Sequence, residues 1–191
     1  MKSMILAAGL AVLTLATGAA AGAQAQAFTA AANSRFTLDL DTAAGNYSEW
    51  SARDLSGLDA MRAKVTIARL VPDKRWRPVA RIVVGGRLEE APFRVVSRTD
   101  GAPLEVSVMR LREGKVVGEV IALPTVRPDE VFRLEAQWTP AGLVTFVLTS
   151  TATGPGGAKA SIQLDAAPTA VTAMVSTGEV KLAPIELGTV K

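Results

Sequence analysis

The sequence contains neither histidine nor cysteine, and this absence excludes much of the usual chemistry of proteins. Histidine is the common general base near neutral pH and the commonest metal ligand. The cysteine thiolate serves as nucleophile, metal ligand and disulfide partner. A Ser-His-Asp triad, a zinc site built from histidine or cysteine, a thiol redox centre and a disulfide are therefore all excluded.

Carboxylates are the remaining candidates for acid–base chemistry, but their spacing does not suit it. Glycoside hydrolysis needs two carboxyl groups about 5–10 Å apart. Glu89 and Glu90 are adjacent, so on a strand their side chains point to opposite faces. Asp39, Asp41 and Asn46 offer oxygen ligands for calcium, yet the spacing of a calcium-binding loop is absent. We predict no catalytic residue, no metal site and no cofactor.

Arginines recur within the segments that have strand patterns, namely Arg69, Arg81, Arg94, Arg98, Arg110 and Arg133. If several of them line one concave sheet face, they form a cationic trough for an acidic glycan or a carboxylate-bearing partner. We take Arg81, Arg94 and Arg133 as candidate ligand-binding residues. The alternative is a solvated outer face on which the arginines pair with glutamates of neighbouring strands.

Three aromatic residues are further candidates. Trp76 lies between Arg75 and Arg77, and an exposed tryptophan among cations can stack on a sugar ring or hold an anionic group. Tyr47 and Trp50 lie in a long stretch without clear periodicity and could do the same. We include all five residues among the ligand-binding candidates. The alternative is that the aromatic rings fold back over the edge of the core.

The elements that must position these residues are strands, and the clearest pattern covers residues 131–150. Apolar residues ending at Trp138 alternate with polar ones, as in a strand that buries one face. Residues 139–142 (TPAG) supply a turn, and residues 143–149 return with β-branched residues. The stretch predicts a long antiparallel hairpin with Trp138 in the core.

Further strand patterns cover residues 35–41, 63–71, 79–84, 92–98, 104–112, 115–123, 158–165, 171–175, 180–182 and 185–187. Residues 42–59 lack periodicity and are predicted to form a loop with at most a short helical turn. The apolar phase of residues 104–112 changes after Val108, which predicts a bulge or a sheet switch near Val108 and Met109. Many short strands separated by turns predict an all-β chain, a single antiparallel β-sandwich or jelly roll.

The N-terminal residues have the three parts of a secretory signal. Lys2 provides the positive region, residues 4–16 are apolar but too short to span a bilayer comfortably, and cleavage sites follow Ala25 and Ala27. We predict a signal peptide over residues 1–25, a flexible leader over 26–34 and a β-sandwich domain over 35–191. The signal sequence is of a bacterial type, so we expect a periplasmic or secreted protein.

Composition fits this prediction and limits the partners. The chain has 191 residues, of which 49% are hydrophobic and 20% charged, which suits one globular domain. Its formal net charge of +3 is too small to indicate nucleic acid. We predict no nucleic-acid partner and no permanent membrane span, and the composition leaves the oligomeric state open.

Two stretches resemble a known superfamily. FRLEAQWTPAGLVTFVL (residues 132–148) resembles the strand–turn–strand of concanavalin A-like lectin, laminin-G-like and glucanase sandwiches. STGEVKLAPIELGTV (residues 176–190) looks like the closing strand of that fold, which usually lies beside the N-terminal strand, here RFTLDLD (residues 35–41). Glucanases of the laminarinase type carry E-x-D-x-x-E or a variant longer by one residue. No segment here has that spacing, so the resemblance supplies no catalytic residues.

These observations predict an exported, non-catalytic β-sandwich that binds a glycan or another component of the cell envelope through one sheet face and its rim loops. One alternative is a structural or assembly module that binds another protein, for instance through an exposed edge strand. A second alternative is a carboxylate-dependent polysaccharide hydrolase or lyase, which requires two acidic side chains facing each other across a groove.

Overall fold

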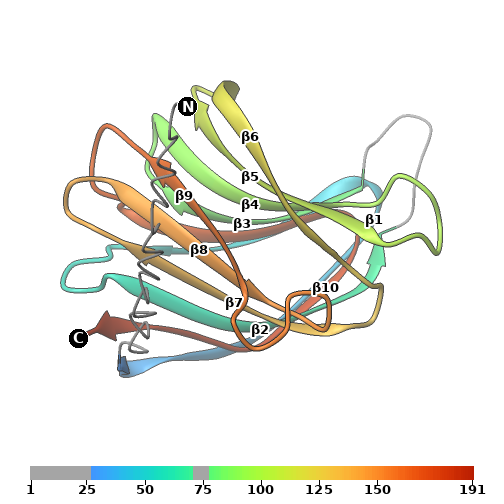
Figure 1. Ribbon diagram of the computed structural model, residues 1–191, viewed down its shortest axis with the longest axis horizontal. Coiled ribbons are helices and arrows are strands. Elements are labelled where there is room, and N and C mark those ends of the chain that lie inside the picture. Colours follow the sequence, from blue (N-terminus) through green and yellow to red (C-terminus); the bar gives the residue numbers. More distant parts are fainter. Residues whose placement is uncertain (1–26, 71–77) are drawn as a thin grey trace, which may run out of the picture.

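The computed structural model describes residues 27–70 and 78–191 and is built from antiparallel β-strands (Figure 1). The strands are β1 (Phe28–Arg53), β2 (Ala60–Leu70), β3 (Val79–Gly85), β4 (Glu89–Val96), β5 (Leu104–Arg112), β6 (Lys115–Val126), β7 (Val131–Trp138), β8 (Leu143–Thr149), β9 (Ala158–Gln163) and β10 (Ala170–Val190). Within the described ranges there is no helix, and hence none that is long and apolar enough to cross a membrane.

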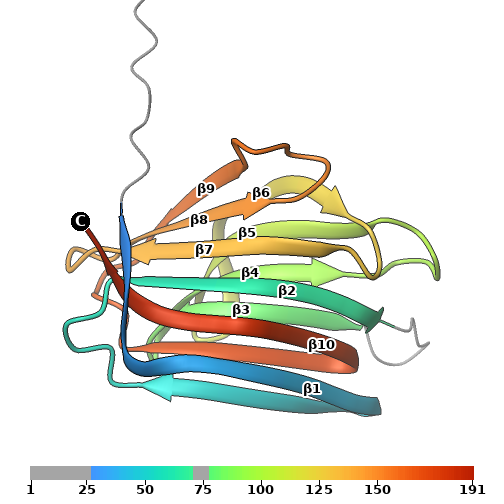
Figure 2. The same ribbon diagram turned by 90° about the horizontal axis from the view of Figure 1, so that it is seen from below.

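Two long strands, β1 and β10, join two layers. Residues 170–176 of β10 pair with β3, whereas residues 178–188 pair with β2. β1 follows β10 along both halves, with a register shift between Thr42 and Tyr47. Figure 2 shows β1 and β10 running side by side through this bend. We call the layer β6-β5-β4-β3-β10-β1 sheet A and the layer β9-β8-β7-β2-β10-β1 sheet B.

The inner faces of the two sheets form one apolar core. The ring of Phe93 in sheet A lies 6.3 Å from that of Phe132 and 6.1 Å from that of Phe146, both in sheet B, measured between centroids. All three side chains are buried, as are the alternating aliphatic residues beside them. This arrangement is a β-sandwich, and the predicted fold class is therefore confirmed.

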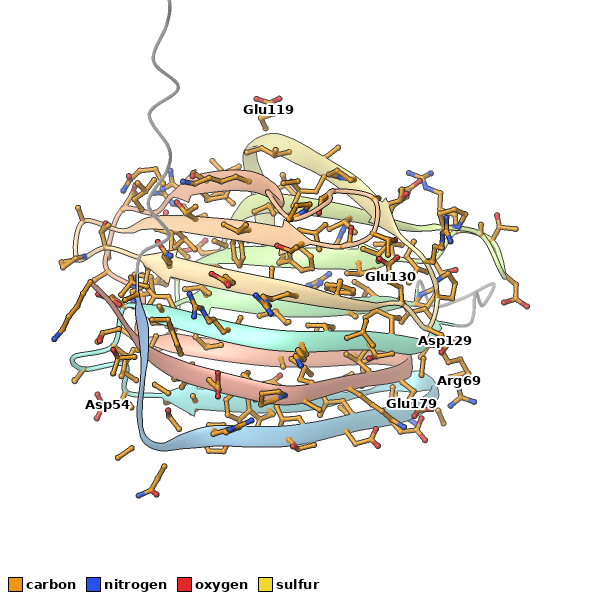
Figure 3. The ribbon with its side chains drawn as sticks, turned by 60° about the horizontal axis from the view of Figure 1, so that its bottom comes forward. Asp54, Arg69, Glu119, Asp129, Glu130 and Glu179 are labelled. Atoms are coloured by element: carbon orange, nitrogen blue, oxygen red, sulfur yellow. The ribbon has the colours of Figure 1, made fainter. Side chains whose placement is uncertain are left out.

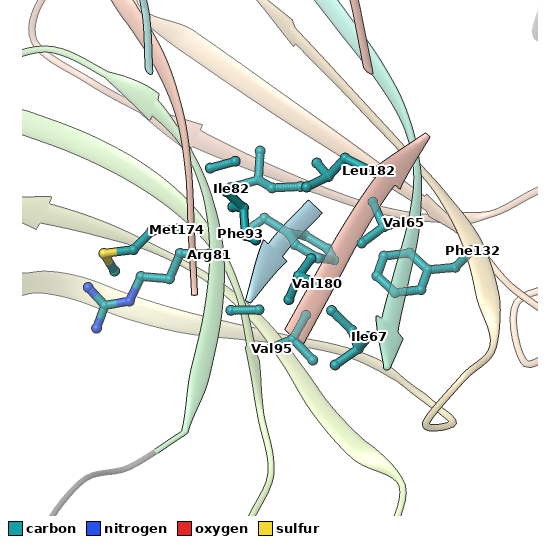
Figure 4. Close-up of a pocket in the computed structure, with 13 residues that line it drawn as sticks. Val65, Ile67, Arg81, Ile82, Phe93, Val95, Phe132, Met174, Val180 and Leu182 are labelled. Atoms are coloured by element: carbon teal, nitrogen blue, oxygen red, sulfur yellow. The ribbon is translucent and has the colours of Figure 1, made fainter. Parts of the chain in front are cut away.

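The core leaves no room for a ligand. A cavity of about 10 Å³ lies between the sheets beside Val65, Ile67 and Phe93, as the close-up in Figure 4 shows. That volume corresponds to about a single water molecule. Any site for a larger ligand in the described part of the chain must therefore lie on an outer face, at an edge or among the loops.

The predicted hairpin is present as β7 and β8, which pair along their length. Gly142 adopts a φ of +84° in the turn between them, a conformation that glycine tolerates best. The Trp138 side chain is buried, and its Nε1–H donates a hydrogen bond of 2.9 Å to the carbonyl of Leu58. The assignment of Trp138 to the core is confirmed.

Both ends of β1 correct the sequence prediction. Residues 28–34, which the sequence suggested as part of a flexible leader, begin β1, and Phe28 pairs with Val190. Residues 42–53, predicted as a loop, also belong to β1. The three short C-terminal strands are likewise one strand, β10. A strand that passes from one layer to the other changes the side chains it buries, so its alternation is interrupted.

The predicted irregularity in β5 is confirmed, because its register with β6 shifts between Val108 and Arg110. The register between β5 and β4 is not shifted at this point. The apolar phase changes because Arg110 takes the inner-face position that follows Val108, whereas Met109 is buried on the outer side.

Candidate functional site

The outer face of sheet A carries a continuous row of directly opposed residues. Crossing β1, β10, β3, β4 and β5, the row reads Glu49, Met174, Arg81, Arg94 and Ser107. In Figure 4 the side chains of Arg81 and Met174 point away from the core residues, on the other side of β3. This follows from the period of two along a strand, since the neighbouring Ile82 is buried in the core.

Arg81 and Arg94 form a like-charged pair at the centre of this row. Their Cα atoms are direct partners across β3 and β4, and both side chains are half-buried. Within the described residues neither has an ion-pair partner, and the Nε atom of each is buried without a hydrogen bond. Like charges directly opposite one another destabilise a sheet. The pair therefore strains the free protein in a way that an anion would relieve.

Burial and the neighbouring charge both act on Arg81. Burial lowers the pKa of the Arg81 guanidinium, the positive charge of Arg94 lowers it further, and the carboxylate of Glu90 partly opposes them. The group remains cationic near neutral pH, because an arginine pKa lies far above 7. Two weakly hydrated guanidinium groups side by side are well suited to bind carboxylates through parallel N–H···O bonds.

Apolar residues lie beside the arginine pair. Val83 and Pro92 are direct partners one row away, with Met109 following on β5 in the same phase. Pro92 and Met109 are buried and Val83 is half-buried. A ligand on this face would thus meet guanidinium donors beside an apolar surface, a combination that suits a sugar ring carrying a carboxylate.

The structure brings together only some of the predicted ligand-binding residues. Tyr47 is 68% exposed and lies at the rim of the outer face of sheet A, two residues from Glu49 on edge strand β1. Trp50 instead packs on Phe36, with 5.5 Å between ring centroids. Arg133 lies on the outer face of sheet B. Trp76, Arg75 and Arg77 lie outside the described residues.

The remaining strand arginines pair with acids. Arg69 contacts Asp41 at 3.0 Å, at the end of the sandwich that also carries Glu179 (Figure 3). Arg98 contacts Glu105 at 2.6 Å. For these two residues the alternative prediction, a solvated face with paired charges, describes the structure.

One charged cluster that the sequence did not suggest lies where the two sheets meet. Glu89 accepts a hydrogen bond of 2.6 Å from the backbone N–H of Asp165, one of 2.5 Å from Arg110 and one of 2.8 Å from Nε of Arg112. Arg110 also donates to the Asp165 carboxylate at 2.5 Å, and Arg112 contacts the same group. The cluster links the start of β4 and the end of β5 to the segment after β9.

This cluster keeps Glu89 ionised. The Asp165 N–H and then Arg110 lower the pKa of Glu89 to about 2. Glu90, the next residue, pairs with Leu111 on the opposite face, which confirms that Glu89 and Glu90 do not face one another. A carboxyl group with so low a pKa cannot be the proton donor that glycoside hydrolysis requires near neutral pH. The sequence feature that could have indicated this cluster is that Glu89 and Arg110 both occupy inner-face positions of their strands.

Metal binding finds no support in the part of the chain that the structure describes. No group of three or more acidic side chains there lies close enough together to hold a metal ion. Asp39, one of the oxygen ligands considered above, instead lies 3.7 Å from the ammonium group of Lys181.

Comparisons with known proteins identify the class of fold. No protein-family model and no curated protein matches the sequence. The solved structure of the galectin LEC-6 from Caenorhabditis elegans is similar, with a TM-score of 0.54, 9% identity and coverage of 82% of this chain and 97% of that one. The protein SO2946 of unknown function from Shewanella oneidensis MR-1 has a TM-score of 0.50 and 9% identity, over 85% of this chain and 81% of that one. A pseudo β-1,3-glucanase of Mycobacterium tuberculosis, Rv0315, gives 0.47 and 14%, over 82% and 75%.

The similarity to the galectin confirms the predicted resemblance at the level of the fold. The chain is a β-sandwich whose fold is similar to that of the galectin. At 9% identity to the galectin, the likeness shows the fold alone, and function must be argued from the site.

Proposed function

We propose that the protein is an exported, non-catalytic β-sandwich that binds an acidic glycan on the outer face of sheet A. The Arg81–Arg94 pair carries the proposal, because it places two half-buried guanidinium groups opposite each other without an acidic partner among the described residues. A galectin shares the fold, which supports a lectin-like use of this face. The signal-like N-terminus supports export.

The chemistry of the face favours a carboxylated sugar over a neutral one. A uronate carboxylate placed between the two guanidinium groups would offset their repulsion and accept their N–H donors. The apolar face of the sugar ring would pack on Val83, which is half-buried in the row beside the arginine pair. Because the binding is between opposite charges on an outer face, it should weaken as salt rises.

A binding protein fits better than a hydrolase because three acids of sheet A already have hydrogen-bond or ion-pair partners. Glu89 is held ionised in the inter-sheet cluster. Glu105 pairs with Arg98. Glu49, on edge strand β1, accepts a hydrogen bond of 3.1 Å from the Ser51 hydroxyl.

Binding measurements with matched variants test the proposal. The purified mature protein would be titrated with a short oligogalacturonate and, as the neutral counterpart, with a cello-oligosaccharide, each at low and high ionic strength. Methionine replaces arginine because it keeps most of the apolar stem. We expect Arg81→Met and Arg94→Met each to weaken oligogalacturonate binding about tenfold or more, since hydrogen bonds to charged groups contribute about 1.5–3 kcal/mol.

Arg98→Met is the control, because it removes the same charge at an exposed ion pair just after β4. It should leave affinity nearly unchanged. Equal losses of affinity in all three variants would mean that only the net charge matters, and would overturn the assignment of the site. Tighter binding of the neutral sugar than of the uronate would overturn the ligand class.

A further inference from the structure

A second like-charged pair lies on the opposite side of the sandwich. Lys64 on β2 and Arg133 on β7 are direct Cα partners on the outer face of sheet B, and both are exposed. Neither forms an ion pair with any residue that the structure describes. Two like charges in directly opposed positions cost stability unless something lies between them.

The pair borders a hollow with an unused polar group. A depression of about 600 Å³ is lined by Lys64, Arg133, Val131, Ser150, Thr151 and Pro155, among others. Ser150 is only 8% exposed, and its hydroxyl has no hydrogen-bond partner among the described residues. Buried hydroxyl groups are normally paired, so an unpaired one in the wall of a hollow is an independent sign of a ligand.

The acids around this hollow are already engaged. Glu130 accepts hydrogen bonds of 2.7 Å from both the backbone N–H and the hydroxyl of Thr151, and one of 3.0 Å from the backbone N–H of Arg127. Glu135 contacts Arg62 at 3.3 Å. Glu186 likewise contacts Arg35, at 3.4 Å. The charges of Lys64 and Arg133 are therefore left uncompensated on this face.

We propose that Lys64, Arg133 and Ser150 form a second binding site for a carboxylated sugar unit, so that the protein is bivalent toward an acidic glycan. The proposal rests on the function proposed above and extends it. Lys64 and Arg133 would hold the carboxylate, and the Ser150 hydroxyl would bond to a ring oxygen or hydroxyl. Val131, 62% exposed, offers the sugar an apolar contact.

The placement of the two sites has a functional consequence. Packed sheets lie about 10 Å apart, and their outer side chains add to that thickness. One short oligosaccharide cannot reach both faces, but two segments of a polymer can be held at once. The protein would therefore cross-link an acidic polysaccharide, and each polymer would gain avidity from the second site.

Stoichiometry separates this inference from the proposed function. In calorimetric titration with a short oligogalacturonate, the wild type should bind two molecules per chain. The double variant Lys64→Met/Arg133→Met and the double variant Arg81→Met/Arg94→Met should each bind one. Long polygalacturonate should form light-scattering complexes with the wild type and with neither double variant. Lys159→Met removes an exposed cation elsewhere on sheet B and should leave both readouts unchanged.

The two ideas fail differently. One molecule bound to the wild type, and none to Arg81→Met/Arg94→Met, would overturn the second site and leave the proposed function standing. Binding that only Lys64→Met/Arg133→Met removes would overturn the assignment of the face of sheet A. No binding to the wild type would overturn both.

Discussion

Replacing Arg94 by methionine should stabilise the free protein while it weakens binding. In the native structure Arg94 lies directly across from Arg81, and the Nε atom of each is buried without a hydrogen-bond partner among the described residues. Methionine removes one charge and one unpaired donor but keeps most of the apolar stem. Residues that a binding site needs often reduce stability in this way.

The size of the effect follows from the geometry. A directly opposed pair of like charges costs about 0.2–1 kcal/mol. Removing a buried donor without a partner adds a gain of similar size, reduced here because the side chain is only half-buried. We expect the free energy of unfolding to rise by about 1 kcal/mol, which for a domain of this size raises the Tm by about 2–4 °C.

Urea denaturation at low and high salt is the assay, with equal m values as the check that only stability has changed. Arg98→Met is the control, because the Arg98 side chain is 76% exposed and its removal should change stability by less than about 0.5 kcal/mol. Oligogalacturonate should raise the Tm of the wild type more than that of Arg94→Met. A fall in stability of more than about 1 kcal/mol for Arg94→Met would mean that Arg94 anchors the fold, and would refute the reasoning.

Three other expectations concern the fold and its processing. Because the folded-state pKa of Glu89 is about 2 against a usual 4.5, its contribution to stability is present above pH 4.5 and is lost as the pH falls toward 2, which unfolding curves of the wild type and Glu89→Gln will show. Trp138→Phe leaves the Leu58 carbonyl without its donor and should lower the free energy of unfolding by about 1–3 kcal/mol, measured by urea denaturation. Cleavage should follow Ala25 and leave 166 of the 191 residues, because cleavage after Ala27 would remove a residue that exchanges backbone hydrogen bonds of 3.2 and 3.1 Å with Lys191. The mass of the mature protein tests this prediction.

Each of these expectations has a contrary result. If the wild type and Glu89→Gln lose stability equally as the pH falls, the cluster does not contribute to the pH dependence of stability. Val144→Ala, a substitution in the core, is the control and should lower the free energy of unfolding. If it does so and Trp138→Phe loses no stability, then water replaces the indole donor. A mature protein that starts at Phe28 would contradict the cleavage site.

The sequence predicted the local strands well where a strand keeps one face in the core throughout. β7 alternates from Phe132 to Trp138, β8 returns after a turn with glycine, and both are present as predicted. Alternation reports burial directly in such strands, whatever their neighbours are. The overall class of fold followed from the number of these strands and the turns between them.

The continuity of β1 and β10 could not be read in the same way. Both strands bend from one layer into the other, with register shifts such as the one between Thr42 and Tyr47. Each bend changes which side chains face inward, so the pattern looks like a loop or like separate strands. Which strands become edges and which cross between layers depends on long-range pairing, which period-2 patterns do not contain.

The arginines show the same limit at the level of the site. The sequence placed Arg81 and Arg94 in neighbouring predicted strands, and the structure shows that they are direct partners. The pairing of Arg133 with Lys64 joins strands far apart in sequence, so no local signal could find it. Sequence alone could therefore identify the arginines as candidates but could not assign them to the two outer faces.

That division also decides between the two interpretations of the charged strands. Where an arginine faces an acid, as Arg98 faces Glu105, the ion pair accounts for its presence and implies no ligand. Where two cations face one another on a sheet, neither has an ion-pair partner in the described fold, and the arrangement costs stability in the free protein. Such positions are tolerated when a function requires them. The two cationic pairs, one on each outer face, are therefore where a ligand should be sought, and the paired arginines are its internal controls.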